Sequence, residues 1–150
     1  MLTTQDVQEY MPDVLDYGII DFEPYFAKTR SDIIRLLNIK WWPLRSRQQY
    51  NITIRGYEGG YYAELDQSLI TESQFTRAAA FHCLAYYILP ALSQFDPASD
   101  RFREMMSYYK ERFEEEFEFI LQDGVEYDSN DDGSVTEAEK APTHFGRLVR

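Results

Sequence analysis

An almost wholly apolar run near the middle of the sequence, residues 78–89, most constrains the fold. The run reads AAAFHCLAYYIL, and as a helix it carries apolar side chains on nearly every face, so it must be buried on all sides. Thr71 followed by Glu72 predicts the start of this helix, which we expect to continue to about Phe95. Pro90 is expected to kink or end it early, because proline lacks the backbone N–H. The rest of the chain must therefore surround this element.

Three further helices are predicted around it. Thr3 and Asp6 have the spacing of a capping box, which predicts a short helix that Pro12 interrupts. Apolar residues at helical spacing predict a second helix over about 22–38, with Pro24 tolerated in its first turn. The same periodicity predicts an amphipathic helix over about 100–122, and Gly124 stands where a C-cap glycine belongs. Its apolar stripe consists of Phe102, Met106, Tyr109, Phe113, Phe117 and Ile120.

The pattern changes between the second helix and the apolar one. Residues 51–55 alternate with a period of two, and glycines follow at 56, 59 and 60, which predicts a β-hairpin over about 44–67. The predicted fold class is therefore mainly α: a small bundle of about four helices with a β-hairpin insertion and an extended C-terminal tail. We expect a helical domain over residues 1–124, followed over 125–150 by a calcium-type loop and a docking tail.

Charge and composition exclude several classes of function. The formal net charge of -11 argues against a surface that binds nucleic-acid phosphates, which needs an excess of Lys and Arg. The sequence shows no long apolar span and no basic leader, so we expect a soluble protein made in the cytoplasm. The lone Cys83 lies in the apolar run and is expected to fill space.

One segment has the residue types of a calcium loop. Residues 128–139, DSNDDGSVTEAE, match the twelve-residue EF-hand pattern at its defining positions, with Gly133 at the sharp turn. Calcium prefers six to eight hard oxygen ligands, which alternate positions of such a loop direct to one centre. The candidate ligands are Asp128, Asn130, Asp132, Ser134 through its carbonyl, Thr136 and Glu139. A single loop predicts weak, structural Ca²⁺ binding, on the order of 10⁻⁴ M or poorer. The alternative is a hydrophilic turn that binds no metal.

The sequence contains no recognisable catalytic motif. His82 lies in the apolar helix and is interpreted as a packing residue, and no nucleophile elbow, phosphate loop or HExxH motif occurs. Glu115 and Glu118 belong to an acidic helix face that is typical of solvated surface. A small metal-dependent hydrolase using these acids is a second alternative. We expect a protein that is not an enzyme.

The C-terminal segment reverses the local charge. Residues 140–150 contain Lys140, Arg147 and Arg150 but no acidic side chain. A basic, partly apolar end suits insertion into a groove of a partner, with Phe145 and Leu148 as anchors. A frayed terminus is the other interpretation. The predicted docking residues are Phe145, Arg147, Leu148 and Arg150.

Several segments together resemble the head–tail connector proteins, or adaptors, of tailed bacteriophages. Residues 27–37 with the Trp41-Trp42-Pro43 end, and then residues 75–89, resemble the two core helices of that family. Residues 102–121 and the acidic turn 124–128 resemble its last helix and tail. Residues 44–67 depart from the shorter connection expected there, so the family does not account for the predicted hairpin.

The resemblance implies a structural role in the virion neck. It implies a homo-oligomeric ring, usually of twelve copies, that binds the portal protein on one side and a stopper or tail-terminator protein on the other. DNA would pass through the lumen without specific binding, and no membrane would be involved. The alternative function is a free-standing calcium-binding regulator with a single EF-hand-like loop.

Overall fold

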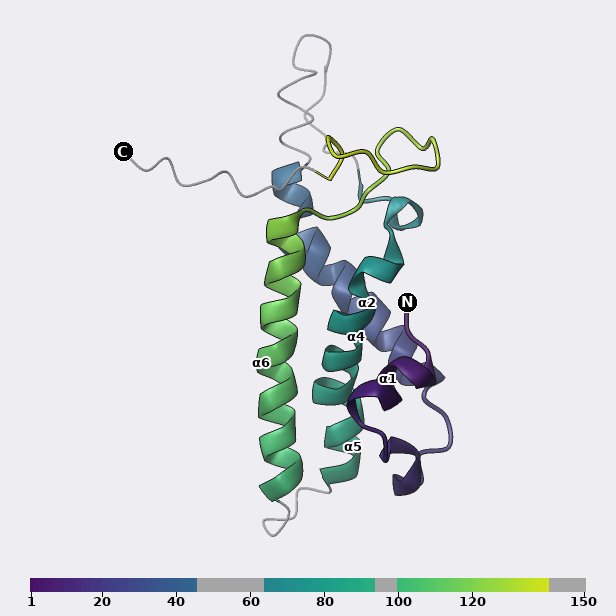
Figure 1. Cartoon of the computed structure of the whole chain (residues 1–150), viewed down its shortest axis with the longest axis vertical. Coiled ribbons are helices and arrows are strands. Elements are labelled where there is room, and N and C mark those ends of the chain that lie inside the picture. Colours follow the sequence, from purple (N-terminus) through teal and green to yellow (C-terminus); the bar gives the residue numbers. More distant parts are fainter. Residues whose placement is uncertain (46–63, 94–99, 141–150) are drawn as a thin grey trace, which may run out of the picture. The chain divides into compact units, whose positions relative to one another are not determined.

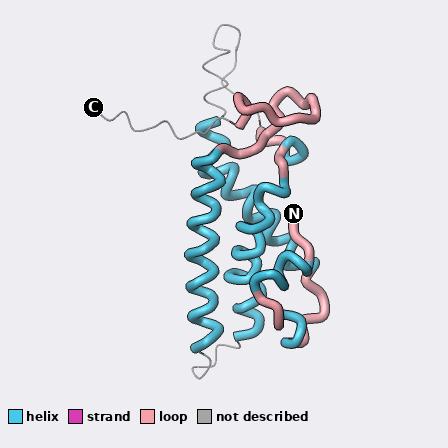
Figure 2. Tube along the Cα trace, viewed as in Figure 1, coloured by secondary structure: helices cyan, strands magenta, loops and turns pink. Residues whose placement is uncertain are grey.

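The computed structural model describes residues 1–45, 64–93 and 100–140, and these residues are mainly helical (Figures 1 and 2). The chain divides into two compact units. The first contains Met1–Asp32 and Glu72–Ile120, and the second contains Ile33–Thr71 and Leu121–Arg150. The predicted boundary between a helical domain, residues 1–124, and a C-terminal segment, residues 125–150, stays a prediction. Within the described ranges, no helix is long and apolar enough to cross a membrane.

Helix α1, Thr4–Tyr10, begins with the predicted capping box. The hydroxyl of Thr3 accepts the N–H of Asp6 at 3.4 Å, and the carboxylate of Asp6 accepts the N–H of Thr3 at 2.7 Å. These two bonds satisfy N–H groups that the first turn of a helix leaves without partners. The helix ends before Pro12, as predicted, and a short 3-10 helix, η1, Val14–Tyr17, follows.

Helix α2, Glu23–Lys40, confirms the second predicted helix. The side chain of Asp21 accepts the N–H of Glu23 at 3.0 Å. Pro24 lies in the first turn, where its missing N–H costs no intrahelical hydrogen bond. Residues up to Asp32 belong to the first unit and the remainder to the second.

The predicted helix over 71–95 is present from Glu72 to Ser93 as a succession of different helical turns, and residues 94 and 95 lie outside the described residues. It begins with a 3-10 turn, η3, Glu72–Phe75, and continues as α4, Thr76–Cys83. A π-helical turn, η4, Leu84–Ile88, leads into α5, Leu89–Ser93. The disturbance expected from Pro90 is therefore a wider turn just before the proline, in which the N–H of Leu89 donates to the carbonyl of Leu84. This π turn lies where the N–H missing from Pro90 interrupts the regular bonding pattern.

The apolar helix is covered by the chain itself. Ala78, Ala79, Ala80, Phe81, Cys83 and Leu84 are all buried. Around them, the ring of Phe81 lies 4.7 Å from that of Tyr10 and 6.0 Å from that of Tyr109. The Tyr109 hydroxyl donates to the carbonyl of Tyr10 at 2.9 Å. Burial of this helix thus needs no second copy of the chain.

Helix α6, Asp100–Asp123, confirms the predicted amphipathic helix. Tyr109, Phe113, Phe117 and Ile120 are buried, while Phe102 and Met106 are half-buried. Gly124 ends the helix with φ +103°, a conformation that L side chains rarely adopt. The C-cap prediction is therefore confirmed.

An aromatic cluster lies at the centre of the second unit. The ring of Tyr127 lies 5.6 Å from that of Trp41 and 5.4 Å from that of Trp42, and all three side chains are buried. An isolated antiparallel bridge joins Tyr127 to Ile70, and the N–H of Asp128 donates to the carbonyl of Leu69 at 3.0 Å. These contacts fix the start of the acidic loop to the segment before η3.

The predicted β-hairpin is not supported. Residues 46–63 of that hairpin lie outside the described residues. At its two ends the prediction is wrong, because Leu44 and Arg45 are helical and Gln67 begins a 3-10 helix, η2, Gln67–Leu69. Asp66 favours this turn by accepting the N–H of Ser68 at 2.9 Å. No strand occurs in the part of the chain that the structure describes.

Candidate functional site

The acidic loop, residues 128–139, lies in the second unit and is held at both ends. Its first residue follows the bridge at Tyr127, and its last is followed by Lys140, whose ammonium lies 3.2 Å from a carboxylate oxygen of Glu126. Asp128 and Glu139 are both buried, although both are acidic. Buried carboxylates need hydrogen-bond donors or cations.

Backbone amides order the first half of the loop. Asp128 accepts the N–H of Gly133 at 2.7 Å and that of Asp132 at 3.2 Å. Asn130 also accepts the N–H of Asp132, at 3.1 Å, and Asp132 accepts the N–H of Ser134 at 2.9 Å. Gly133 allows the turn with φ +85°. The side-chain oxygens of Asp128, Asn130 and Asp132 thus accept hydrogen bonds from the backbone of the loop.

The carboxylate of Glu139 closes the second half. One oxygen accepts the N–H and the hydroxyl of Ser129, both at 2.9 Å. The other accepts the N–H of Thr136 at 3.0 Å and its hydroxyl at 2.9 Å. These hydrogen bonds, from Thr136 and then Ser129, lower the pKa of Glu139 to about 2. Glu139 therefore joins the two halves of the loop by hydrogen bonds alone.

The donor set of the loop fits a hard divalent cation. Asp128, Asn130 and Asp132 supply oxygens that keep free lone pairs after accepting one or two N–H groups each. Within the described ranges, however, no three His, Cys, Asp or Glu side chains converge as they would around an ion. For a cation to gain both Glu139 oxygens, Glu139 must release Ser129 and Thr136. This exchange offsets part of the binding energy.

A buried positive charge also opposes a cation here. Arg45 is 8% exposed, and its Nε has no hydrogen-bond partner in the described structure. Burial lowers the pKa of Arg45, while the carboxylate of Glu139 and the Tyr127 hydroxyl partly offset that effect. The Arg45 guanidinium already interacts with the Glu139 carboxylate that would bind the ion. A cation at that carboxylate would be repelled by the positive charge of Arg45. The periodicity of the sequence gave no signal for this contact.

The predicted docking residues Phe145, Arg147, Leu148 and Arg150 lie outside the described residues. Their role stays a prediction.

The first unit contains a partly buried polar cluster that the sequence patterns did not indicate. The hydroxyl of Tyr87 donates to the carboxylate of Asp32, and Nε2 of His82 lies 3.8 Å from the same oxygen. His82 packs against the rings of Tyr86 and Phe113, which confirms its interpretation as a packing residue, but its Nδ1 has no hydrogen-bond partner in the described structure. Burial lowers the pKa of His82, an effect that Asp32 partly offsets. No sequence spacing marks a cluster built from residues so far apart.

Cys83 is also a packing residue. Its side chain is buried, and burial raises the pKa of its thiol to about 11. A thiol with so high a pKa is a poor nucleophile at neutral pH. The prediction that it fills space is confirmed.

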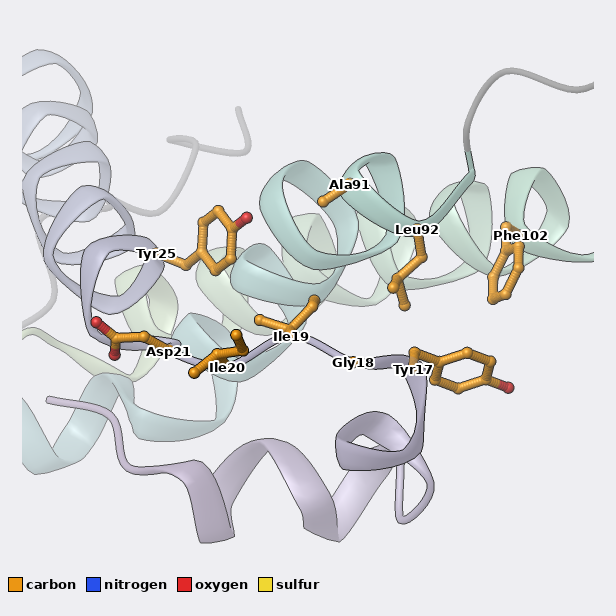
Figure 3. A pocket seen from close by; sticks show the side chains of 9 residues that line it. All are labelled: Tyr17, Gly18, Ile19, Ile20, Asp21, Tyr25, Ala91, Leu92 and Phe102. Carbon is orange, nitrogen blue, oxygen red and sulfur yellow. The ribbon is translucent and has the colours of Figure 1, made fainter.

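A groove of about 650 Å³ lies in the first unit (Figure 3). Figure 3 shows Ile19, from the segment before α2, reaching toward the helix that carries Leu92. The groove is lined by Tyr17, Gly18, Ile19, Ile20, Asp21, Tyr25, Ala91, Leu92 and Phe102. Asp21 is the one charged residue among these lining residues.

Glu115 of α6 forms an ion pair with Arg112 at 2.9 Å on the helix surface. Exposed ion pairs of this kind are common and contribute little energy.

The comparisons with known proteins identify no family for this chain. No family model, no curated protein and no solved structure matches it.

Proposed function

We propose that the chain is a structural adaptor of the neck of a tailed bacteriophage. In this role it forms a ring between the portal and the stopper or tail-terminator protein, with DNA passing through the lumen. It would be synthesised in the host cytoplasm and reside in the virion. The ring would contain several copies, most simply twelve. The protein would act by assembly and not by catalysis.

The order and packing of the elements support this proposal best. Helix α2 leads to Trp41 and Trp42, the apolar α4 and α5 follow, and the long α6 precedes the acidic turn. Those are the segments that carry the resemblance to adaptors. In the second unit, Tyr127 of the acidic turn packs on both tryptophans. The tryptophans that follow α2 and the tyrosine of the acidic turn, both in segments that resemble adaptors, thus pack in one buried cluster.

Charge and exposed apolar side chains are compatible with a ring around DNA. The net charge of -11 disfavours tight contact with phosphates, as a channel wall requires. Several large apolar side chains are exposed, among them Ile20 at 100% and Ile39 at 62%. Single exposed apolar side chains are common on protein surfaces, and these are compatible with contacts to other subunits.

In this proposal the acidic loop clips the C-terminal segment to the body. Glu139 holds the loop closed by hydrogen bonds, and Ca²⁺ at Asp128, Asn130 and Asp132 would tighten it further. The segment beyond Lys140 would then insert Phe145 and Leu148 into the portal, with Arg147 and Arg150 facing acidic groups.

Electron microscopy of the purified protein with portal tests the proposal. We expect ring-shaped particles on the portal and co-sedimentation of the two proteins. A chain ending at Pro142, or one with Phe145→Ala and Leu148→Ala, should keep its circular dichroism spectrum but lose attachment. Thr143→Ala, in the same segment, is the matched control and should attach normally. A protein that ignores portal, stopper and tail components alike would refute the proposal.

A calcium-binding regulator is the second candidate, because the loop has the residue types of an EF-hand. Residues 137–140 form only a turn, so the exiting helix of an EF-hand is missing from the described part of the chain. A regulator should expose apolar surface when calcium is added, visible as increased fluorescence of a hydrophobic dye. An adaptor should show no such increase and should bind portal with or without calcium.

A further inference from the structure

Helix α6 carries an exposed stripe that combines two aromatic rings with an ion pair. Tyr108 is 57% exposed and Phe119 is 56% exposed, although the helix buries other aromatic residues on its opposite side. Eleven residues make about three helical turns, so Tyr108 and Phe119 lie on one line, about 16 Å apart. Arg112 and Glu115 lie between them on the same side and form an ion pair at 2.9 Å.

The stripe is complementary to itself when it is reversed. Arg112 follows Tyr108 by four residues, and Glu115 precedes Phe119 by four residues. An antiparallel second copy of α6, related by a two-fold axis through the middle of the stripe, therefore brings unlike residues together. Tyr108 meets Phe119 of the second copy, and Arg112 meets its Glu115. The two-fold symmetry repeats both pairings, as an isologous interface requires.

We propose that two copies of this chain pair through α6 in this antiparallel register. The aromatic pairs at the two ends remove four exposed rings from water, and the central charges alternate in sign across the contact. Within the chain, the Arg112 guanidinium lies 5.8 Å from the Phe81 ring centroid. The pairing is independent of the neck proposal, because a two-fold pair differs from the head-to-tail contact of a ring.

Other charges on α6 limit the strength of the pair. Glu111 and Glu118 flank the stripe on the exposed side, so two copies approach against like charges. The contact is short and made by one helix from each copy. We therefore expect reversible pairing that increases with protein concentration, not a permanent dimer.

Charge exchange across the stripe provides the test, with the full chain studied by sedimentation equilibrium. Arg112→Glu or Glu115→Arg alone places like charges at both central crossings and should weaken self-association about tenfold, the effect of about 1.4 kcal/mol. The double variant R112E/E115R should restore it. Mixing the two single variants should produce a heterodimer, because each supplies the charges that the other lacks. Glu114→Arg, which makes the same charge change on another side of α6, is the matched control and should pair normally.

Loss of the aromatic contact gives a second measurement. Phe119→Ser and Tyr108→Ser should each reduce pairing while leaving the thermal unfolding curve nearly unchanged, since both rings are exposed in the single chain. A chain of 17.8 kDa that stays monomeric at every concentration would overturn the inference. So would self-association that the charge exchanges leave unchanged. A ring that forms on portal with all these variants would support the neck proposal while the α6 pairing failed.

Discussion

The side chain of Glu139 accepts both the N–H and the hydroxyl of Ser129, each at 2.9 Å, across ten residues of the acidic loop. The same carboxylate binds Thr136 through its second oxygen. The residue expected to close a calcium cage is thus already satisfied by the protein. A metal ion must compete with these hydrogen bonds, so they limit the affinity of the loop for the ion. The same hydrogen bonds make the stability of the loop depend on pH.

Calcium binding should be weak. We expect a dissociation constant on the order of 10⁻⁴ M or poorer by isothermal titration. Asp128→Ala should weaken binding further and increase proteolysis of the loop, because it also removes the acceptor for Gly133. Arg45→Met should tighten binding by removing the positive charge beside Glu139. Absence of calcium heat, together with unchanged protease sensitivity of Asp128→Ala, would exclude the proposed metal clip.

The loop should open in acid. Since the folded-state pKa of Glu139, about 2, lies below the unfolded value near 4.3, its carboxylate stabilises the fold above about pH 4.3. That contribution is lost as the pH falls from about 4.3 to 2. Hydrogen bonds from Ser134 also lower the pKa of Asp132, which acts in the same direction. A carboxyl carbon titration by NMR should place the Glu139 midpoint near 2.

A Glu139→Gln variant provides the control for that titration. It keeps the size of the side chain but cannot ionise, so its loop stability should vary less between about pH 4.3 and 2. A Glu139 midpoint near its ordinary value would show that the hydrogen bonds from Ser129 and Thr136 do not form in solution.

Local signals predicted much of the fold. The capping box of Thr3 and Asp6 depends on residues three apart, and the amphipathic period of α6 is visible in a single stretch of chain. Both predictions are confirmed for that reason. The division of Glu72–Ser93 into 3-10, α and π turns was missed, because it depends on which carbonyls find N–H partners near Pro90. The apolar helix also proved to be covered within the chain.

Long-range relationships were not predictable from the pattern. The packing of Tyr127 on Trp41 and Trp42 joins segments that are far apart in the sequence, and no periodicity encodes it. In the loop, the residue types predicted oxygens directed to a calcium centre, whereas Asp128 and Asn130 accept hydrogen bonds from backbone amides of the loop. That Glu139 is already hydrogen-bonded depends on the conformation of all twelve residues, which residue types alone do not specify.

Gly124 should tolerate no side chain. A Cβ added there would lie 1.7 Å from the carbonyl oxygen of Lys140, and the backbone has φ +103°. Gly18 has a similar conformation, φ +83°, but open space around it. We expect Gly18→Ala to cost about 1 kcal/mol from backbone strain alone, and Gly124→Ala to cost clearly more. Urea unfolding of both variants measures the difference, and equal losses would contradict the close approach of Lys140.

His82 should make the stability of the protein depend on pH near neutrality. Burial lowers the pKa of His82 in the folded chain below its ordinary value, and Asp32 only partly offsets this. As the pH falls, His82 is therefore protonated in the unfolded chain before it is protonated in the folded chain. The contribution of His82 to stability is complete above about pH 6.5 and falls as the pH drops toward the folded-state pKa. Nδ1 of His82 has no hydrogen-bond partner in the described structure, so Phe can replace the ring without losing a bond there. Urea unfolding between about pH 7.5 and 5 should show a smaller pH dependence for His82→Phe than for the unchanged chain. An identical dependence of the unfolding free energy on pH in both proteins would mean that His82 is charged, or freely hydrated, in the folded state.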